Sequence, residues 1–202
     1  MRHSSPPGTK ITIRRGVPSE VQAEAVQLYW QAFAPKLGRV LGPDARAIDL
    51  LSRAVQPDHA VVALDSAGGL VAMAGFRSPH GAFMPLSPRN LARVYGRFGG
   101  FLRSGLLRWL GEDADQGHFL IDGIVVRPDW RGRGVGSAMI ADLAAQAQAT
   151  GYGTLCLEVS DDNVRARALY ERLGFQPGRR QRLRLLAPVF GMSGSTVMIR
   201  PV

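Results

Sequence analysis

Cysteine is almost absent from this chain of 202 residues, and long apolar runs are missing. The single cysteine, Cys156, excludes an internal disulfide and fits a reducing compartment. It lies within the apolar run 154–159, so we expect a buried strand residue and not a nucleophile. No apolar run reaches about 18 residues, and the first residues lack the pattern of a signal peptide. We therefore expect a cytoplasmic protein with no membrane span, in which residues 1–9 form a disordered tail.

Lysine is also scarce, because the basic residues comprise 23 arginines and only Lys10 and Lys36. The formal net charge of +9 suits an anionic cofactor, although an arginine surplus beside so much alanine and glycine also fits codon bias. Charge alone does not establish a nucleic-acid partner, which we regard as the less favoured alternative. His3, His59 and His80 lack the spacing of metal ligands, so no metal is expected.

A glycine-rich segment joins an expected strand to an expected helix. The apolar run 119–126 precedes it, and the alanine-rich segment 138–150 follows it without glycine or proline. Alternating glycines let the backbone approach a ligand, and free N–H groups at a helix start bind anions. The segment lacks the Gly-Lys-Ser/Thr of a Walker A loop and the third glycine of a dinucleotide-binding fingerprint. We therefore expect a phosphate or pyrophosphate ligand of another class.

A second segment, 158–175, has the pattern strand, helix cap, helix and stop. Asn163, with the two aspartates before it, offers oxygen atoms for an N-cap. Gly174 stands where a left-handed residue ends a helix, and Phe175 follows it to pack back. Asn163 and Tyr170 are seven residues apart and therefore share one helix face.

Together these segments resemble the GNAT superfamily of N-acetyltransferases. The first matches its pyrophosphate loop, Arg-x-x-Gly-x-Gly, at Arg131, Gly134 and Gly136. The second matches its Asn…Ala-x-x-Leu-Tyr-x-x-x-Gly-Phe segment at every position. The resemblance implies acetyl transfer from acetyl-CoA to a primary amine by direct attack, with these cofactor-binding residues: Ile124, Val125, Val126, Arg131, Gly132, Arg133, Gly134, Val135, Gly136, Ser137, Asn163 and Tyr170.

The same resemblance implies two catalytic residues, Tyr170 as the acid for the departing thiolate and Asp122 as the base. Taking a proton from a lysine-like ammonium costs an ordinary aspartate roughly 9 kcal/mol, so burial, a weakly basic amine or a water chain must help. His118 is the second candidate base, because its usual pKa suits the task better and a regular strand would place it on the same face. Gly123 indicates a bulge or a close backbone approach in that strand.

The order of expected elements matches a GNAT-like α/β fold, with a mixed sheet of about seven strands flanked by helices. We expect one domain over 10–202. An insertion, 77–117, lies between the expected third and fourth strands and contains an amphipathic helix that we expect to be interrupted. Gly99 and Gly100 predict the break. This helix could cap the substrate cleft, pack a homodimer, or bind membrane or nucleic acid. The expected strands are 10–15, 59–64, 70–76, 118–126, 154–159, 182–186 and 196–200, and the expected helices are 18–34, 44–55 and 135–150.

The amine acceptor cannot be derived from these residues. A peptide amine, a polyamine, an amino acid and an antibiotic all stay open. A non-catalytic acyl-CoA sensor or scaffold of the same fold is the alternative function.

Overall fold

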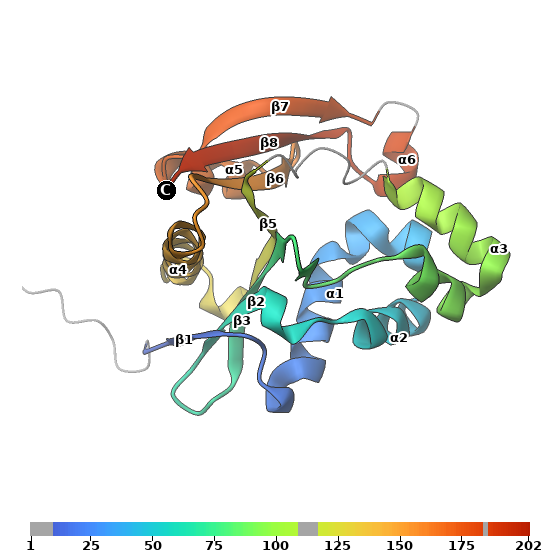
Figure 1. The fold of residues 1–202 in the computed structure, drawn as a ribbon, viewed down its shortest axis with the longest axis horizontal. Coiled ribbons are helices and arrows are strands. Elements are labelled where there is room, and N and C mark those ends of the chain that lie inside the picture. Colours follow the sequence, from blue (N-terminus) through green and yellow to red (C-terminus); the bar gives the residue numbers. More distant parts are fainter. Residues whose placement is uncertain (1–9, 109–116, 184–185) are drawn as a thin grey trace, which may run out of the picture.

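The computed structural model describes residues 10–108, 117–183 and 186–202, which build a mixed eight-stranded sheet (Figure 1). The strand order is β1-β2-β3-β5-β6-β8-β7, with β4 paired to β3. The strands are β1 Thr12–Arg15, β2 Ala60–Leu64, β3 Leu70–Ser78, β4 Gly81–Ala82, β5 Phe119–Val126, β6 Thr154–Ser160, β7 Gln176–Arg182 and β8 Gly194–Pro201. The α-helices are α1 Gln22–Leu41, α2 Asp44–Ala54, α3 Pro88–Arg108, α4 Val135–Ala149, α5 Val164–Arg172 and α6 Ala187–Phe190. The expected mixed sheet is confirmed, with the two-residue β4 added to its expected strands, whereas the expected tail at 1–9 lies outside the described residues.

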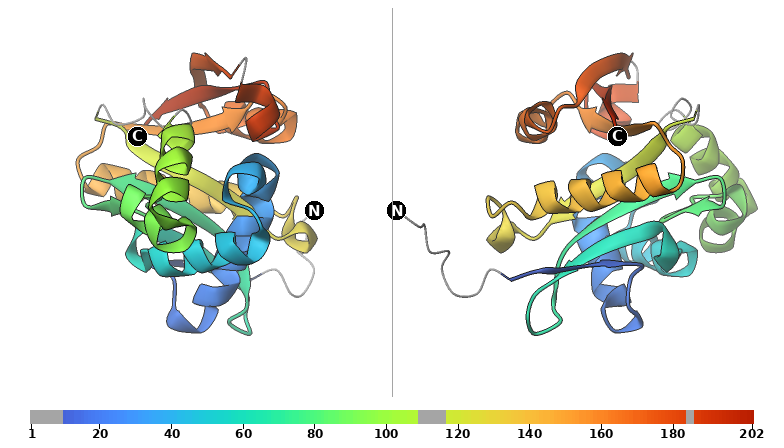
Figure 2. Two further views of the ribbon diagram at one scale, coloured as in Figure 1. Left: turned by 90° about the vertical axis from the view of Figure 1, so that its right-hand side faces the viewer. Right: turned by 60° about the vertical axis from the view of Figure 1, so that its left-hand side comes forward.

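Helices cover both faces of the sheet (Figures 1 and 2). One core lies under α1, α2 and α3, and the other lies under α4 and α5. The pleat of β2 explains how one apolar strand serves both, since Val62 packs into the first core while Val61 and Ala63 pack into the second. All five residues of β2 are therefore buried, which accounts for its lack of polar alternation.

Two element boundaries differ from those expected. Helix α1 passes through Pro35 and ends at Leu41, whereas the sequence predicted that this helix ends near Ala34. Its buried residues on both sides of Pro35 fix the helix through packing. Strand β7 spans Gln176–Arg182 and not 182–186; of the expected span, residues 184–185 lie outside the described residues. It is an exposed edge strand with a bulge after Pro177, so no apolar alternation marks it in the sequence.

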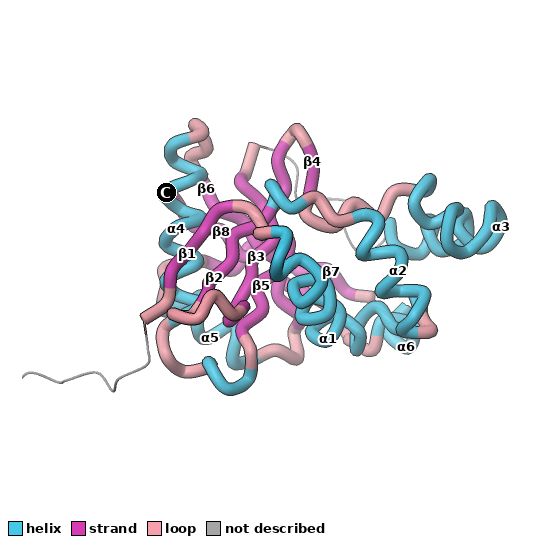
Figure 3. The backbone as a smooth tube through the Cα atoms, turned by 90° about the horizontal axis from the view of Figure 1, so that it is seen from below, coloured by secondary structure: helices cyan, strands magenta, loops and turns pink. Residues whose placement is uncertain are grey.

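The insertion after β3 contains β4 and then α3 (Figure 3). Helix α3 thus follows the small β4 and does not directly follow the third strand. Its helical path is interrupted at Gly96, where φ is +76°, and not at Gly99 and Gly100. Gly100 is instead a packing position, because an added Cβ would lie 2.6 Å from the backbone of Ala92. Across the described ranges, no helix is both long and apolar enough to cross a membrane.

Candidate active site

The site lies where strands β5 and β6 separate. The two strands pair in parallel only as far as Ile121 and Leu157, as the crossover through α4 predicts. The residues immediately beyond this pair are Asp122 and Glu158, one on each strand. From there to Val126 the β5 backbone pairs with β3 on one side only. Strand separation therefore leaves one edge of β5 available to a ligand.

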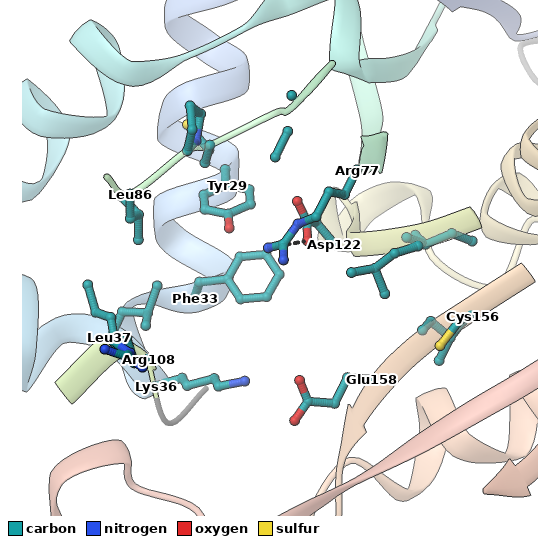
Figure 4. Close-up of a pocket in the computed structure, with 18 of the residues that line it drawn as sticks. Tyr29, Phe33, Lys36, Leu37, Arg77, Leu86, Arg108, Asp122, Cys156 and Glu158 are labelled. Atoms are coloured by element: carbon teal, nitrogen blue, oxygen red, sulfur yellow. Dashed lines mark hydrogen bonds and ion pairs between the residues drawn. The ribbon is translucent and has the colours of Figure 1, made fainter. Parts of the chain in front are cut away.

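Two cavities meet at this fork. The larger, of about 720 Å³, lies between α1, the β3–α3 insertion and strands β5 and β6. The smaller, of about 400 Å³, lies between the fork, the start of α5 and α6. Four residues line both cavities, and Figure 4 shows them around one opening: Phe33, Lys36, Asp122 and Glu158.

Asp122 sits at a bulge in β5. Its neighbours Ile121 and Gly123 pair with the adjacent residues Phe76 and Gly75 of β3, so Asp122 is the extra residue. Arg77 donates to its carboxylate, with Nη2 3.3 Å from Oδ1. Burial raises the pKa of Asp122, and the positive charges of Arg77 and His59 oppose that rise.

Gly123 explains how closely α1 approaches the bulge. An added Cβ at Gly123 would lie 2.4 Å from the ring of Phe33. Phe33 packs against Tyr29, with ring centroids 4.5 Å apart and the ring planes tilted by 34°, and both rings line the larger cavity. The expected close backbone approach is thus an approach to an aromatic ring of the protein itself.

Glu158 is a site residue that the sequence analysis missed. It is the exposed member of β6, whose neighbours Leu157 and Val159 are buried. Ser195 donates a hydrogen bond to its carboxylate. An acidic residue inside an otherwise apolar strand was the available indication, because such a strand has little reason to carry a charge except at a site.

Tyr170 and Asn163 line the smaller cavity, as their shared helix face predicted. The Asn163 side chain caps α5, with Oδ1 accepting from Ala166 N at 3.1 Å, which leaves its amide N–H₂ group to serve a ligand. Burial raises the pKa of Tyr170 to about 12. The hydroxyl consequently stays protonated at neutral pH.

The glycine-rich loop lies before α4, at the open edge of β5. Gly132 and Gly134 have φ of +77° and +80°, and Gly134 caps α4 without a side-chain hydrogen bond. The first N–H groups of α4 therefore point outward. Arg131 donates to Val126 O at 3.1 Å, and the Arg133 guanidinium lies 5.1 Å from the centroid of the Trp130 ring.

His118 and Cys156 are the two remaining residues for which the sequence raised a chemical role, as a base and as a nucleophile. His118 lies before β5, hydrogen-bonds to Thr154 and lines neither cavity. The structure therefore does not bring this alternative base into the site. Cys156 is buried, as expected from its strand, and burial raises the pKa of its thiol to about 11. A thiol that stays protonated is a poor nucleophile.

Sequence comparison matches residues 23–175 to the acetyltransferase (GNAT) family. A shorter match joins the chain to the [ribosomal protein bS18]-alanine N-acetyltransferase of Escherichia coli, 44% identical over 52 residues. That match covers 26% of this chain and 35% of the relative, so it spans about a third of the relative's length.

Solved structures give the same fold over nearly the whole chain. A GCN5-related N-acetyltransferase from Kribbella flavida superposes with a TM-score of 0.60 at 18% identity, covering 95% of this chain and 98% of its own. The ribosomal-protein-S18-alanine N-acetyltransferase from Escherichia coli gives a TM-score of 0.56 at 16% identity, covering 96% and 94%. With the family match over most of its residues, the chain belongs to the acetyltransferase (GNAT) family.

Proposed function

We propose that this protein transfers an acetyl group from acetyl-CoA to a primary amine by direct attack of the amine on the thioester. The observation that supports this proposal most is the fork between β5 and β6. It joins a cavity beside Tyr170 to a second cavity beside Asp122, so a donor and an acceptor can meet at one opening. A ternary complex needs such a shared opening, because both substrates must be held together for attack.

The donor binds along the open edge of β5 and at the start of α4. The N–H groups of Val135, Gly136 and Ser137 take the pyrophosphate, with Arg131 and Arg133 beside them. The edge of 124–126 that faces away from β3 hydrogen-bonds the pantetheine amides as a neighbouring strand would. The Asn163 amide adds a further donor on the opposite wall.

Asp122 acts as the base in this proposal. Its raised pKa makes the carboxylate a better proton acceptor than an ordinary aspartate, and Arg77 holds it in place. Glu158, exposed on the opposite strand, passes the proton onward to solvent or shares the role. The two carboxylates also attract the ammonium form of the acceptor to the fork.

Tyr170 acts as the acid. With its pKa near 12, complete proton transfer to a thiolate of ordinary pKa is uphill by about 3.5 units. Tyr170 therefore begins as a hydrogen-bond donor to the sulfur, and the transfer completes as negative charge builds on that atom.

Calorimetric titration with acetyl-CoA tests the donor site, comparing wild type with Gly134→Asp. We expect micromolar binding in the wild type and its loss in the variant, because the change places a carboxylate at the anion site. Gly151→Asp is the matched control: Gly151 follows α4, has φ of +84° and likewise has open space around it. It carries the same backbone penalty away from the loop and should bind normally.

Absence of acetyl-CoA binding in the wild type would overturn the proposed function. Binding without release of free thiol, across primary amines of every class, would instead favour the acyl-CoA sensor or scaffold. Thiol release is followed with a chromogenic disulfide.

A further inference from the structure

The larger cavity has an apolar wall opposite the two carboxylates. Tyr29, Phe33 and Leu37 of α1 form one side, while Met84 and Leu86 come from the insertion. Leu107 of α3 completes the wall, so the insertion lines this cavity. Such a wall favours a bulky apolar group on the acceptor.

Lys36 brings a positive charge into the same opening. It is half-buried on α1, lines both cavities, and its side chain points toward Glu158 in Figure 4. Across residues 10–108, 117–183 and 186–202, its ammonium has no hydrogen-bond or ion-pair partner. A cation at the opening that has no protein partner there is available to pair with an anionic group of a ligand.

The charges around the opening therefore alternate. Lys36 is positive, Glu158 is negative, and Asp122 is negative with Arg77 beside it. A ligand bearing an ammonium next to a carboxylate complements this order, since its ammonium faces the acids while its carboxylate faces Lys36. A polyamine would place further positive charge near Lys36 and gains no such complement.

We propose that the acceptor is a free α-amino acid with a bulky apolar side chain, and that Lys36 recognises its carboxylate. This inference rests on the proposed function. The α-nitrogen loses a proton to the carboxylates and forms the new N–C bond as the thioester C–S bond breaks. Coenzyme A leaves as the thiol after taking a proton from Tyr170. The apolar side chain lies against Phe33, Met84 and Leu86.

The test compares L-phenylalanine with L-phenylalaninamide, L-alanine and spermidine as acceptors, by thiol release at saturating acetyl-CoA. We expect kcat/KM for phenylalanine to exceed that for its amide by about tenfold or more, because a charge-assisted hydrogen bond is lost in the amide. Lys36→Gln should reduce this acid-to-amide ratio to near one, while Lys36→Arg keeps it. Lys10→Gln replaces the other lysine, which is exposed two residues before β1, and should leave the ratio unchanged.

Acetyl-CoA titration distinguishes a failure of the proposed function from a failure of the amino-acid assignment. No donor binding would overturn the proposed function itself. Donor binding with turnover of the amide or of spermidine equal to or above that of phenylalanine would overturn only the amino-acid assignment. Donor binding with no turnover of phenylalanine would overturn it as well, and an acid-to-amide ratio unchanged by Lys36→Gln would remove Lys36 from recognition.

Discussion

Asp122 and Glu158 occupy equivalent places on two diverging strands, yet their surroundings differ. Asp122 is held by Arg77 at a bulge, with its pKa raised by burial. Glu158 is exposed and accepts a hydrogen bond from Ser195. The pH dependence of the reaction can therefore separate their roles, because only one of them responds to Arg77.

Replacing Arg77 with methionine should move the acidic limb of the kcat/KM profile to higher pH. Arg77 lowers the pKa of Asp122, so its removal raises that pKa, and deprotonation of the base then requires a higher pH. The measurement is kcat/KM by thiol release between pH 5 and pH 9. Arg127→Met is the control, since Arg127 has similar exposure but pairs with Asp129. A limb that stays in place would assign the base to Glu158.

Tyr170→Phe should lower kcat by about 100-fold and leave the acetyl-CoA dissociation constant within about twofold. The ring and its packing on Phe175 remain, while the donor to the leaving sulfur is lost. Single-turnover kinetics and calorimetry measure the two quantities separately. Tyr152→Phe alters a tyrosine that packs on Phe119 and lines neither cavity, so its kcat should match the wild type. Equal kcat values for both variants would exclude Tyr170 as the acid.

At the scale of elements, the start of α4 depends on the left-handed conformation of Gly134 and not on space around it. Open space surrounds the position of an added Cβ, so Gly134→Ala should cost about 1 kcal/mol of stability from the backbone alone. Gly136 lies inside the helix, where an added Cβ makes ordinary contact with Leu169 at 3.7 Å. Gly136→Ala should therefore leave the free energy of unfolding unchanged or slightly higher. Urea denaturation compares the two, and equal losses would contradict this account.

In helix α3, the space around a glycine and not its backbone conformation determines how a substitution by alanine changes stability. Gly100→Ala should lower the free energy of unfolding by about 2 kcal/mol, because the new Cβ meets the backbone at Ala92, which cannot move aside. Gly105→Ala in the same helix meets open space and should be neutral or stabilising. Thermal and urea unfolding of both variants provide the measurement. A Gly100→Ala protein as stable as the wild type would show that the two parts of α3 do not pack closely.

The sequence predicted the elements whose boundaries are set by the conformational or hydrogen-bonding preferences of single residues. Gly134 and Asn163 mark helix starts by their own conformational and hydrogen-bonding chemistry, and both lie where expected. Strand β7 and Lys36 are not marked by such local preferences. Pairing with β8 fixes the position of β7, and the position of Lys36 at the cavities depends on α1 continuing past Pro35. Features created by tertiary packing thus escaped a local analysis, and they include most of the lining of the larger cavity.

For the molecule as a whole, the net charge of +9 should make donor binding depend on salt. We expect the acetyl-CoA dissociation constant to rise by about threefold or more when NaCl increases from about 50 to about 500 mM, because the phosphates are screened from the arginines. An acetyl thioester of N-acetylcysteamine lacks those phosphates and serves as the control donor. Its KM should hardly change with salt, and an equal change in both donors would refute an electrostatic origin.

The exposed edge strand β7 has a consequence for association between molecules. An open strand edge invites another chain to extend the sheet, but β7 combines Pro177, a bulge and arginines along its length. These features make intermolecular sheet growth unfavourable there. By contrast, helix α3 exposes three large apolar side chains, Phe98, Phe101 and Leu102. Such side chains favour association with another apolar surface. Copies of this protein that meet in a crowded solution should therefore adhere through helices and not through fibril-like strand addition.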